Sequence, residues 1–85
     1  MKSLKRLDEL ASDPAFKQTG WDSYGASPLD DRAVEAVRRF LLYEWDIVLC
    51  NDGGLQLEKH HSDCDIEVEF SPEGTITSIF ARPAE

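Results

Sequence analysis

The chain has 85 residues, of which 17 are acidic and nine are basic, and its formal net charge is −8. A chain of this length predicts one domain spanning residues 1–85, with a small core that hides about 60–65% of the unfolded surface. No apolar run approaches the roughly 18 residues of a membrane span, and charged residues interrupt the apolar ones after Met1. We therefore expect a cytoplasmic protein, with no secretory signal and no membrane partner.

The charge is distributed unevenly along the chain. Residues 1–43 contain seven basic and seven acidic residues, whereas residues 44–85 contain two and ten. The whole net charge therefore belongs to the second half. Such a surface repels nucleic acid and attracts basic proteins, although solubility alone also explains an acidic surface.

Two helices are predicted in the first half. Leu4, Leu7 and Leu10 recur at helical spacing, which predicts a short amphipathic helix over Ser3–Ser12 that ends at Asp13-Pro14. Residues 15–17 predict one further turn. A longer amphipathic pattern predicts a helix over Leu29–Tyr43, capped by Ser27 or, one turn later, by Asp30.

After residue 43 the apolar period changes from 3.6 to 2, which predicts strands. Turn residues, first Asn51-Asp52-Gly53-Gly54 and later Ser71-Pro72-Glu73-Gly74, separate these strands. The predicted strands are Asp46–Cys50, Leu55–His60, Asp65–Phe70 and Thr75–Ala81. The fold class is therefore α+β, with two N-terminal helices packed on a four-stranded antiparallel β-meander.

Alternation gives the predicted sheet one apolar and one acidic side. We expect the long helix to cover the apolar side, which consists of Leu55, Leu57, Ile66, Val68, Phe70, Ile76 and Phe80. The opposite side would carry Glu58, Asp65, Glu67 and Glu69, with Lys59 and Arg82 as the only cations nearby in sequence. Antiparallel sheets often leave one face in water, so these carboxylates are either a binding surface or a solvated face.

The segment Gly20–Pro28 places two aromatic residues in a loop between the predicted helices. It lacks the convergent polar groups of a small-molecule site, so a packed corner is favoured over a ligand site. In this interpretation Trp21 and Tyr24 fill the gap between helix and sheet, Asp22 accepts backbone amides, and Gly25 supplies an unusual backbone angle.

Two stretches of the sequence together resemble a group of small proteins from bacteria, phages and mobile elements. They are Trp21-Asp22-Ser23-Tyr24-Gly25-Ala26 and Asp52-Gly53-Gly54-Leu55-Gln56-Leu57-Glu58, the second followed by His60, with Ile66–Phe70 and Gly74 further on. The resemblance covers most of residues 20–74 and implies no particular activity. Ser23 stands where the pattern has glycine, and Lys59 stands where it has tryptophan, which puts any ligand shared through that tryptophan in doubt.

Catalysis is not expected, because no nucleophile has an evident base and the Gly53-Gly54 pair lacks the lysine of a phosphate loop. His60, His61, Asp63 and Cys64 form the one cluster of ligand-type residues, but their spacing matches no usual zinc pattern. Cys50 and Cys64 are expected to be reduced, although strand neighbours could bring them together.

The leading hypothesis is a non-catalytic protein-binding inhibitor without a cofactor. Its acidic sheet side would dock on a larger protein with a basic, nucleic-acid-binding surface. The mobile-element resemblance suggests counter-defence of the anti-CRISPR kind. The alternatives are a small ligand- or metal-binding accessory protein that uses the His60–Cys64 cluster, and a subunit that self-associates through a strand edge.

Overall fold

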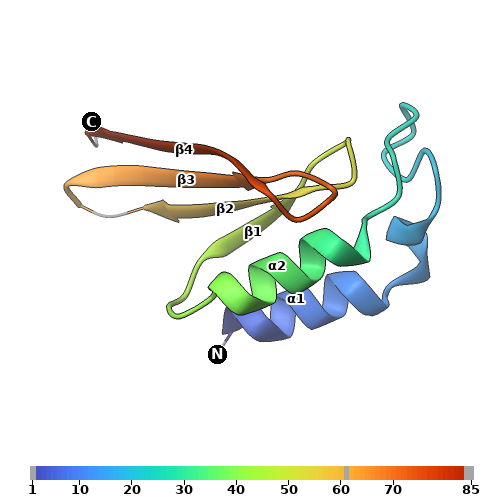
Figure 1. Ribbon diagram of the computed structural model, residues 1–85, viewed down its shortest axis with the longest axis horizontal. Helices are drawn as coiled ribbons and strands as arrows, with labels where there is room; N and C mark the ends of the chain where they lie inside the picture. Colours follow the sequence, from blue (N-terminus) through green and yellow to red (C-terminus); the bar gives the residue numbers. More distant parts are fainter. Residues whose placement is uncertain (1, 61, 84–85) are drawn as a thin grey trace.

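The computed structural model describes residues 2–60 and 62–83, and these form an α+β fold with one antiparallel sheet. Figure 1 shows two helices lying side by side along one side of the sheet. The elements are α1 (Lys2–Ser12), a 3₁₀ turn η1 (Pro14–Lys17), α2 (Asp31–Phe40), β1 (Asp46–Leu49), β2 (Leu55–His60), β3 (Cys64–Phe70) and β4 (Ile76–Pro83). The predicted α+β class and meander are confirmed, because the strand order is β1-β2-β3-β4. Both helices precede the strands, but only α1 is N-terminal, since α2 lies near the middle of the chain.

Helix α2 is shorter than the predicted Leu29–Tyr43. It begins after Asp30, whose carboxylate accepts the Arg32 amide at 2.8 Å, so the later of the two predicted caps is the one used. Ser27 lies outside the helix, and its amide donates to the carbonyl of Asn51 at 2.7 Å. The helix ends at Phe40 because Leu41 already has an extended backbone.

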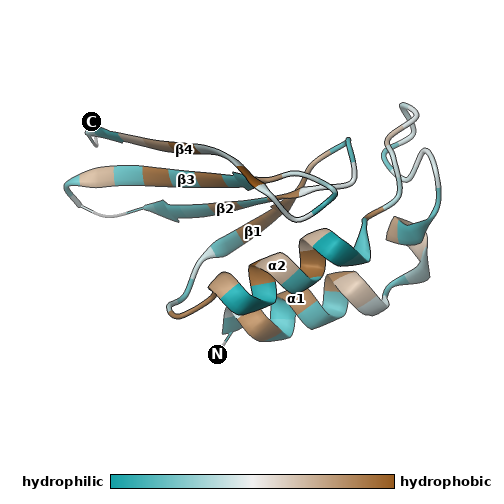
Figure 2. Cartoon of the chain, viewed as in Figure 1, coloured by the Kyte–Doolittle hydropathy of each residue, from teal (hydrophilic) through white to brown (hydrophobic). Residues whose placement is uncertain are grey.

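The core lies between the helices and strands β1–β3. Its buried side chains are Leu7 and Leu10 of α1, Ala33, Val34 and Val37 of α2, Ile47 of β1, Leu55 and Leu57 of β2, and Val68 and Phe70 of β3, together with Leu29 and Leu41. The Phe40 ring packs edge-on against Phe70, with 5.5 Å between centroids. In Figure 2, hydrophobic and hydrophilic residues alternate along β3, as expected of a strand covered on one face.

The start of α1 is held by residues from the other half of the chain. The Ser3 hydroxyl is buried and accepts the Trp45 amide at 2.7 Å, and the Ser3 amide donates to a Glu44 carboxylate oxygen at 3.1 Å. Glu44 therefore caps a helix 41 residues earlier in the chain. This contact fixes α1 to the start of β1.

The strand β4 is displaced from its predicted register by a β-bulge. Ile76 is opposite Phe70 and Ser78 is opposite Glu69, so Thr77 has no directly opposite residue. One extra residue moves every later side chain to the other face. The prediction that Phe80 faces the helices is therefore wrong, because Phe80 is opposite Glu67 on the acidic side.

The uncovered strand of this sheet is β4. It lies farthest from the helices, and every residue from Ile76 to Pro83 is exposed (Figure 1). Ile76 is 41% exposed and so does not join the buried core, contrary to prediction. The helices thus cover three strands and leave the fourth open on both faces.

Candidate binding surface

Cross-strand pairing brings five carboxylates onto the face of the sheet turned away from the helices. We call this set the acidic face: Asp46, Glu58, Asp65, Glu67 and Glu69. Asp46 is opposite Glu58, and Glu58 is opposite Glu67, so three acids stand in one row across β1, β2 and β3. Asp46 was not among the predicted residues, although its alternation with the buried Ile47 could have placed it here.

The acidic face contains few cations. His60 Nδ1 lies 2.9 Å from Asp65 Oδ1, and Arg82 Nε lies 3.7 Å from Asp65 Oδ2. His60 Nε2 is also 3.8 Å from Glu58 Oε2. The hydrogen bond with Asp65 is the main cause that raises the pKa of His60 above its ordinary value. Within residues 2–60 and 62–83, Glu67 has no ion-pair partner.

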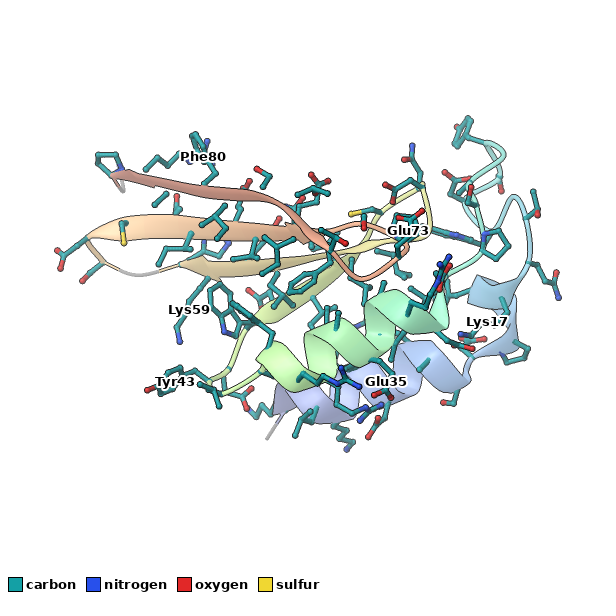
Figure 3. All side chains as sticks on the ribbon, in the orientation of Figure 1. Lys17, Glu35, Tyr43, Lys59, Glu73 and Phe80 are labelled. Carbon is teal, nitrogen blue, oxygen red and sulfur yellow. The ribbon has the colours of Figure 1, made fainter. Side chains whose placement is uncertain are left out.

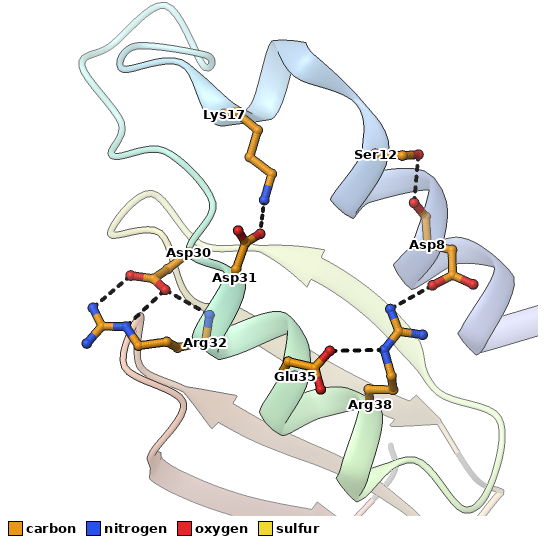
Figure 4. Close-up of polar contacts among 8 residues, drawn as sticks. All are labelled: Asp8, Ser12, Lys17, Asp30, Asp31, Arg32, Glu35 and Arg38. Carbon is orange, nitrogen blue, oxygen red and sulfur yellow. Dashed lines mark hydrogen bonds and ion pairs between the residues drawn. The ribbon is translucent and has the colours of Figure 1, made fainter.

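The helical half is different, because its acids pair with its own bases. Figure 4 shows Arg38 between Asp8, at 2.7 Å, and Glu35, at 3.6 Å. Lys17 pairs with Asp31 in the same view. Exposed pairs of this kind contribute up to about 1 kcal/mol each. Their importance here is that they neutralise the helical half locally, whereas the acidic face keeps its charge.

The predicted corner residues are only partly structural. Asp22 Oδ1 accepts the amides of Tyr24, at 2.8 Å, and Ala26, at 3.1 Å, which is the role expected of it. Trp21 is half-buried, packs edge-on against Phe16 and donates to the carbonyl of Ser27 at 2.8 Å. Gly25 has a φ of +81°.

Tyr24 does not fill the gap between helix and sheet, because it is 92% exposed. The loop is held by the amides that Asp22 accepts and by Trp21, which packs against Phe16, and the Tyr24 ring takes part in none of these contacts. That prediction is wrong.

The segment between the Trp21–Ala26 loop and α2 contacts the turn between β1 and β2. The amide of Asp30 donates to the carbonyl of Gly53 at 3.0 Å, and the carbonyl of Asn51 accepts the amide of Ser27. Asp52 Oδ1 accepts the amide of Gly54 at 2.8 Å. The chain just before α2 is thus docked on the turn between β1 and β2.

Ser23 and Lys59, the two departures from the resembled pattern, differ in how well they fit their surroundings. Ser23 has a φ of +69°, a backbone conformation that glycine adopts more easily than serine. The Lys59 ammonium lies 5.3 Å from the ring centroid of Tyr43 and 5.6 Å from that of Trp45. Figure 3 shows Lys59 and Tyr43 at the same end of the molecule.

A cleft of about 480 Å³ lies next to this aromatic pair and was missed from the sequence. Its lining combines both charges: Lys2, Ser3, Arg6, Glu44, Trp45, Asp46, Ile47, Glu58, Lys59 and His60. Lys59 already covers the Trp45 ring, and Glu44 already caps α1. Lys59 and Glu44, two of the charged residues that line the cleft, therefore already have partners within the protein.

The residues of the predicted metal cluster are not gathered into a site. His60 ends β2 with Nδ1 engaged by Asp65, Cys64 begins β3, and Asp63 is exposed in the turn. His61 lies outside the described residues. Over residues 2–60 and 62–83, no three His, Cys, Asp or Glu side chains come together as metal ligands.

The two cysteines are free and lie at opposite ends of the sheet. Cys50 Sγ is 4.0 Å from a carboxylate oxygen of Glu69, near the end of β3, whereas Cys64 starts that strand. Five residues of strand span about 17 Å, far more than a disulfide allows. The suggestion that strand pairing joins them is therefore wrong.

Comparison with protein-family models, curated proteins and solved structures gave no match. No helix in the described part of the chain is both long enough and apolar enough to cross a membrane. What the protein does is therefore argued from its surface.

Proposed function

We propose that this protein is a non-catalytic binding protein whose acidic face docks on a basic surface of a larger protein. The row of Asp46, Glu58 and Glu67 is the observation that carries the proposal. Like charges directly opposite each other destabilise a sheet, by roughly 0.2–1 kcal/mol per pair. Lysine or arginine side chains of a partner would relieve that repulsion.

The position of the charges supports docking rather than solubility alone. Four of the five carboxylates belong to half-buried residues on regular strands, so they are held in fixed positions. A fixed field of one sign steers an oppositely charged protein and accelerates association. Solubility would be served equally well by acids scattered over the helices, where Asp8, Asp31 and Glu35 are instead paired with basic side chains.

The finer form of the proposal concerns the partner. A surface basic enough to fit this face is typical of proteins that hold nucleic acid, so docking would exclude nucleic acid from its site. The resemblance to proteins of phages and mobile elements adds counter-defence, as in anti-CRISPR inhibitors. Such a role needs a cytoplasmic location, and it needs no cofactor, membrane or direct contact with nucleic acid.

The test uses two double variants that remove the same number of charges. Glu67→Gln with Glu69→Gln neutralises the acidic face. Glu9→Gln with Glu73→Gln neutralises two exposed acids on α1 and on the turn before β4. The parent and both variants are immobilised and used to capture proteins from a bacterial lysate, with and without added duplex DNA.

We expect the parent and the control variant to capture the same basic protein from the lysate. The acidic-face variant should not capture it, and added duplex DNA should displace it from the parent. Retention should also weaken as salt rises, because exposed charges are screened. Equal loss by both variants would reduce the effect to net charge. Retention by the acidic-face variant would remove this face from the mechanism.

A further inference from the structure

The edge of β4 is an open strand without the usual protection against pairing. It pairs with β3 on one side and with no other strand of the described chain. Natural edges are blunted by charges, prolines or a covering element. From Ile76 to Ala81 the strand contains no charged residue and no proline, and Arg82-Pro83 follows only at its end.

Both faces of this edge are apolar at the surface. Ile79 lies on the face of the helices, opposite Val68, yet is 68% exposed because the helical layer stops short of β4. Phe80 lies on the acidic side and is 50% exposed, and Figure 3 shows it pointing away from the helices. The middle of β4 is coloured as hydrophobic in Figure 2.

The two faces beside the edge differ in charge. On one face the neighbours of β4 are the apolar Val68 and Phe70. On the other face Ser78 is opposite Glu69 and Phe80 is opposite Glu67. A strand added to β4 would lie two strand spacings, about 10 Å, from β3. A lysine or arginine on that strand can reach Glu69 across the small Ser78.

We propose that β4 accepts an extended segment of the partner as a fifth strand, in which lysine or arginine alternates with valine, isoleucine or leucine. The basic side chains lie over Glu67 and Glu69, and the apolar ones lie beside Ile79. This inference rests on the proposed docking of the acidic face and names the part of the partner that it binds. A second copy of this chain fits less well, because it brings its own Glu67 and Glu69, on the strand beside its β4, instead of a row of cations.

The probe is a pair of synthetic octapeptides with blocked ends and identical composition. One alternates lysine with valine, and the other carries four lysines followed by four valines. Binding is titrated by NMR on the labelled protein, and amide exchange of residues 78–81 is measured with and without peptide. We expect the alternating peptide to bind at least about tenfold more tightly and to slow exchange of β4 amides, because strand addition gives them partners.

Two protein variants separate the strand from the charge. Ile79→Lys places a cation in the apolar row of β4, and Leu42→Lys makes the same change at a residue that is 76% exposed outside the sheet. We expect Ile79→Lys to weaken the alternating peptide at least about tenfold and Leu42→Lys to weaken it less than twofold. Each variant is shown to be folded if its amide chemical shifts outside β4 match those of the parent protein.

Failure of this inference differs from failure of the proposed function. Equal binding of both peptides, with no slowing of β4 exchange and no effect of Ile79→Lys, would overturn strand addition. If Glu67→Gln with Glu69→Gln still weakened both peptides, docking of the acidic face would stand. A concentration-dependent dimer that Ile79→Lys converts to monomer would make a second copy the occupant and would also overturn the inference.

Discussion

Gly54→Ala, in the turn between β1 and β2, is expected to destabilise the fold strongly. A Cβ at residue 54 would lie 2.1 Å from the carbonyl oxygen of Phe70. Both groups belong to the backbone, so no side-chain rotation relieves the overlap, and β2 must move away from β3 where Leu55 pairs with Phe70. Overpacking usually costs about 1–3 kcal/mol, and a backbone clash belongs at or above the upper end.

We therefore expect Gly54→Ala to lower the free energy of unfolding by at least about 3 kcal/mol, out of roughly 4–13 kcal/mol for a chain of this size. The melting temperature should fall by about 12 °C or more. Urea denaturation followed by circular dichroism measures the first value, and a thermal scan measures the second.

Gly25→Ala is the matched control. Gly25 has a φ of +81°, but a Cβ there meets nothing within 4 Å. The substitution therefore carries only the cost of a left-handed residue, about 1–2 kcal/mol. Equal losses for the two variants, or a loss below about 1 kcal/mol for Gly54→Ala, would refute the steric reasoning.

Three further predictions concern single side chains. Ser23→Gly should raise stability by about 0.5 kcal/mol, because it removes left-handed strain and the greater freedom of unfolded glycine offsets only part of the gain; urea denaturation showing a loss would contradict this. NMR titration should give His60 a pKa above 6.5 that falls in Asp65→Asn. The raised pKa stabilises the fold below pH 6.5 and this contribution disappears as pH rises through the folded value, so Asp65→Asn should lose more stability at pH 5 than at pH 8. Burial raises the pKa of Cys50 to about 11, with Glu69 adding to the effect, so at pH 8 a thiol-specific disulfide reagent should modify Cys50 about a hundredfold more slowly than an ordinary cysteine.

Periodicity in the sequence was sufficient to predict the type of every element. The helical spacing of Leu7 and Leu10, and the strict alternation from Asp65 to Phe70, reflect which side chains face the core, so they predict both the elements and their buried faces. The residues at which helices and strands end were harder to predict from the sequence. Helix α2 stops at Phe40, three residues before the predicted end, and the extended chain after it carries Glu44 to the first turn of α1, a contact between distant residues that periodicity does not contain.

The features of the site that were predicted wrongly have one thing in common. Each depends on tertiary contacts. The bulge at Thr77 reverses the side of Phe80, and alternation in a single strand contains no record of an extra residue. Of the two aromatic rings in the loop, Trp21 packs against Phe16 and Tyr24 is exposed, and the composition of the loop does not reveal which ring finds a partner. Four acids were placed on one face correctly, and Asp46 was left out although its alternation with Ile47 indicated the same face.

Some residues of the chain are held by contacts within the fold, whereas the row of acids on the sheet places like charges together, and this contrast indicates where to look for function. The glycines at positions 53 and 54 and the carboxylate of Asp22 are held by contacts within the fold, so replacing them would damage stability before it affected any partner. The row through Glu58 and Glu67 does the opposite, because it places like charges together and weakens the sheet. Under the proposed function, the cations of a bound partner remove this repulsion. The open edge of β4 borders the same row, so one partner segment could satisfy the unpaired backbone and the unpaired charge together.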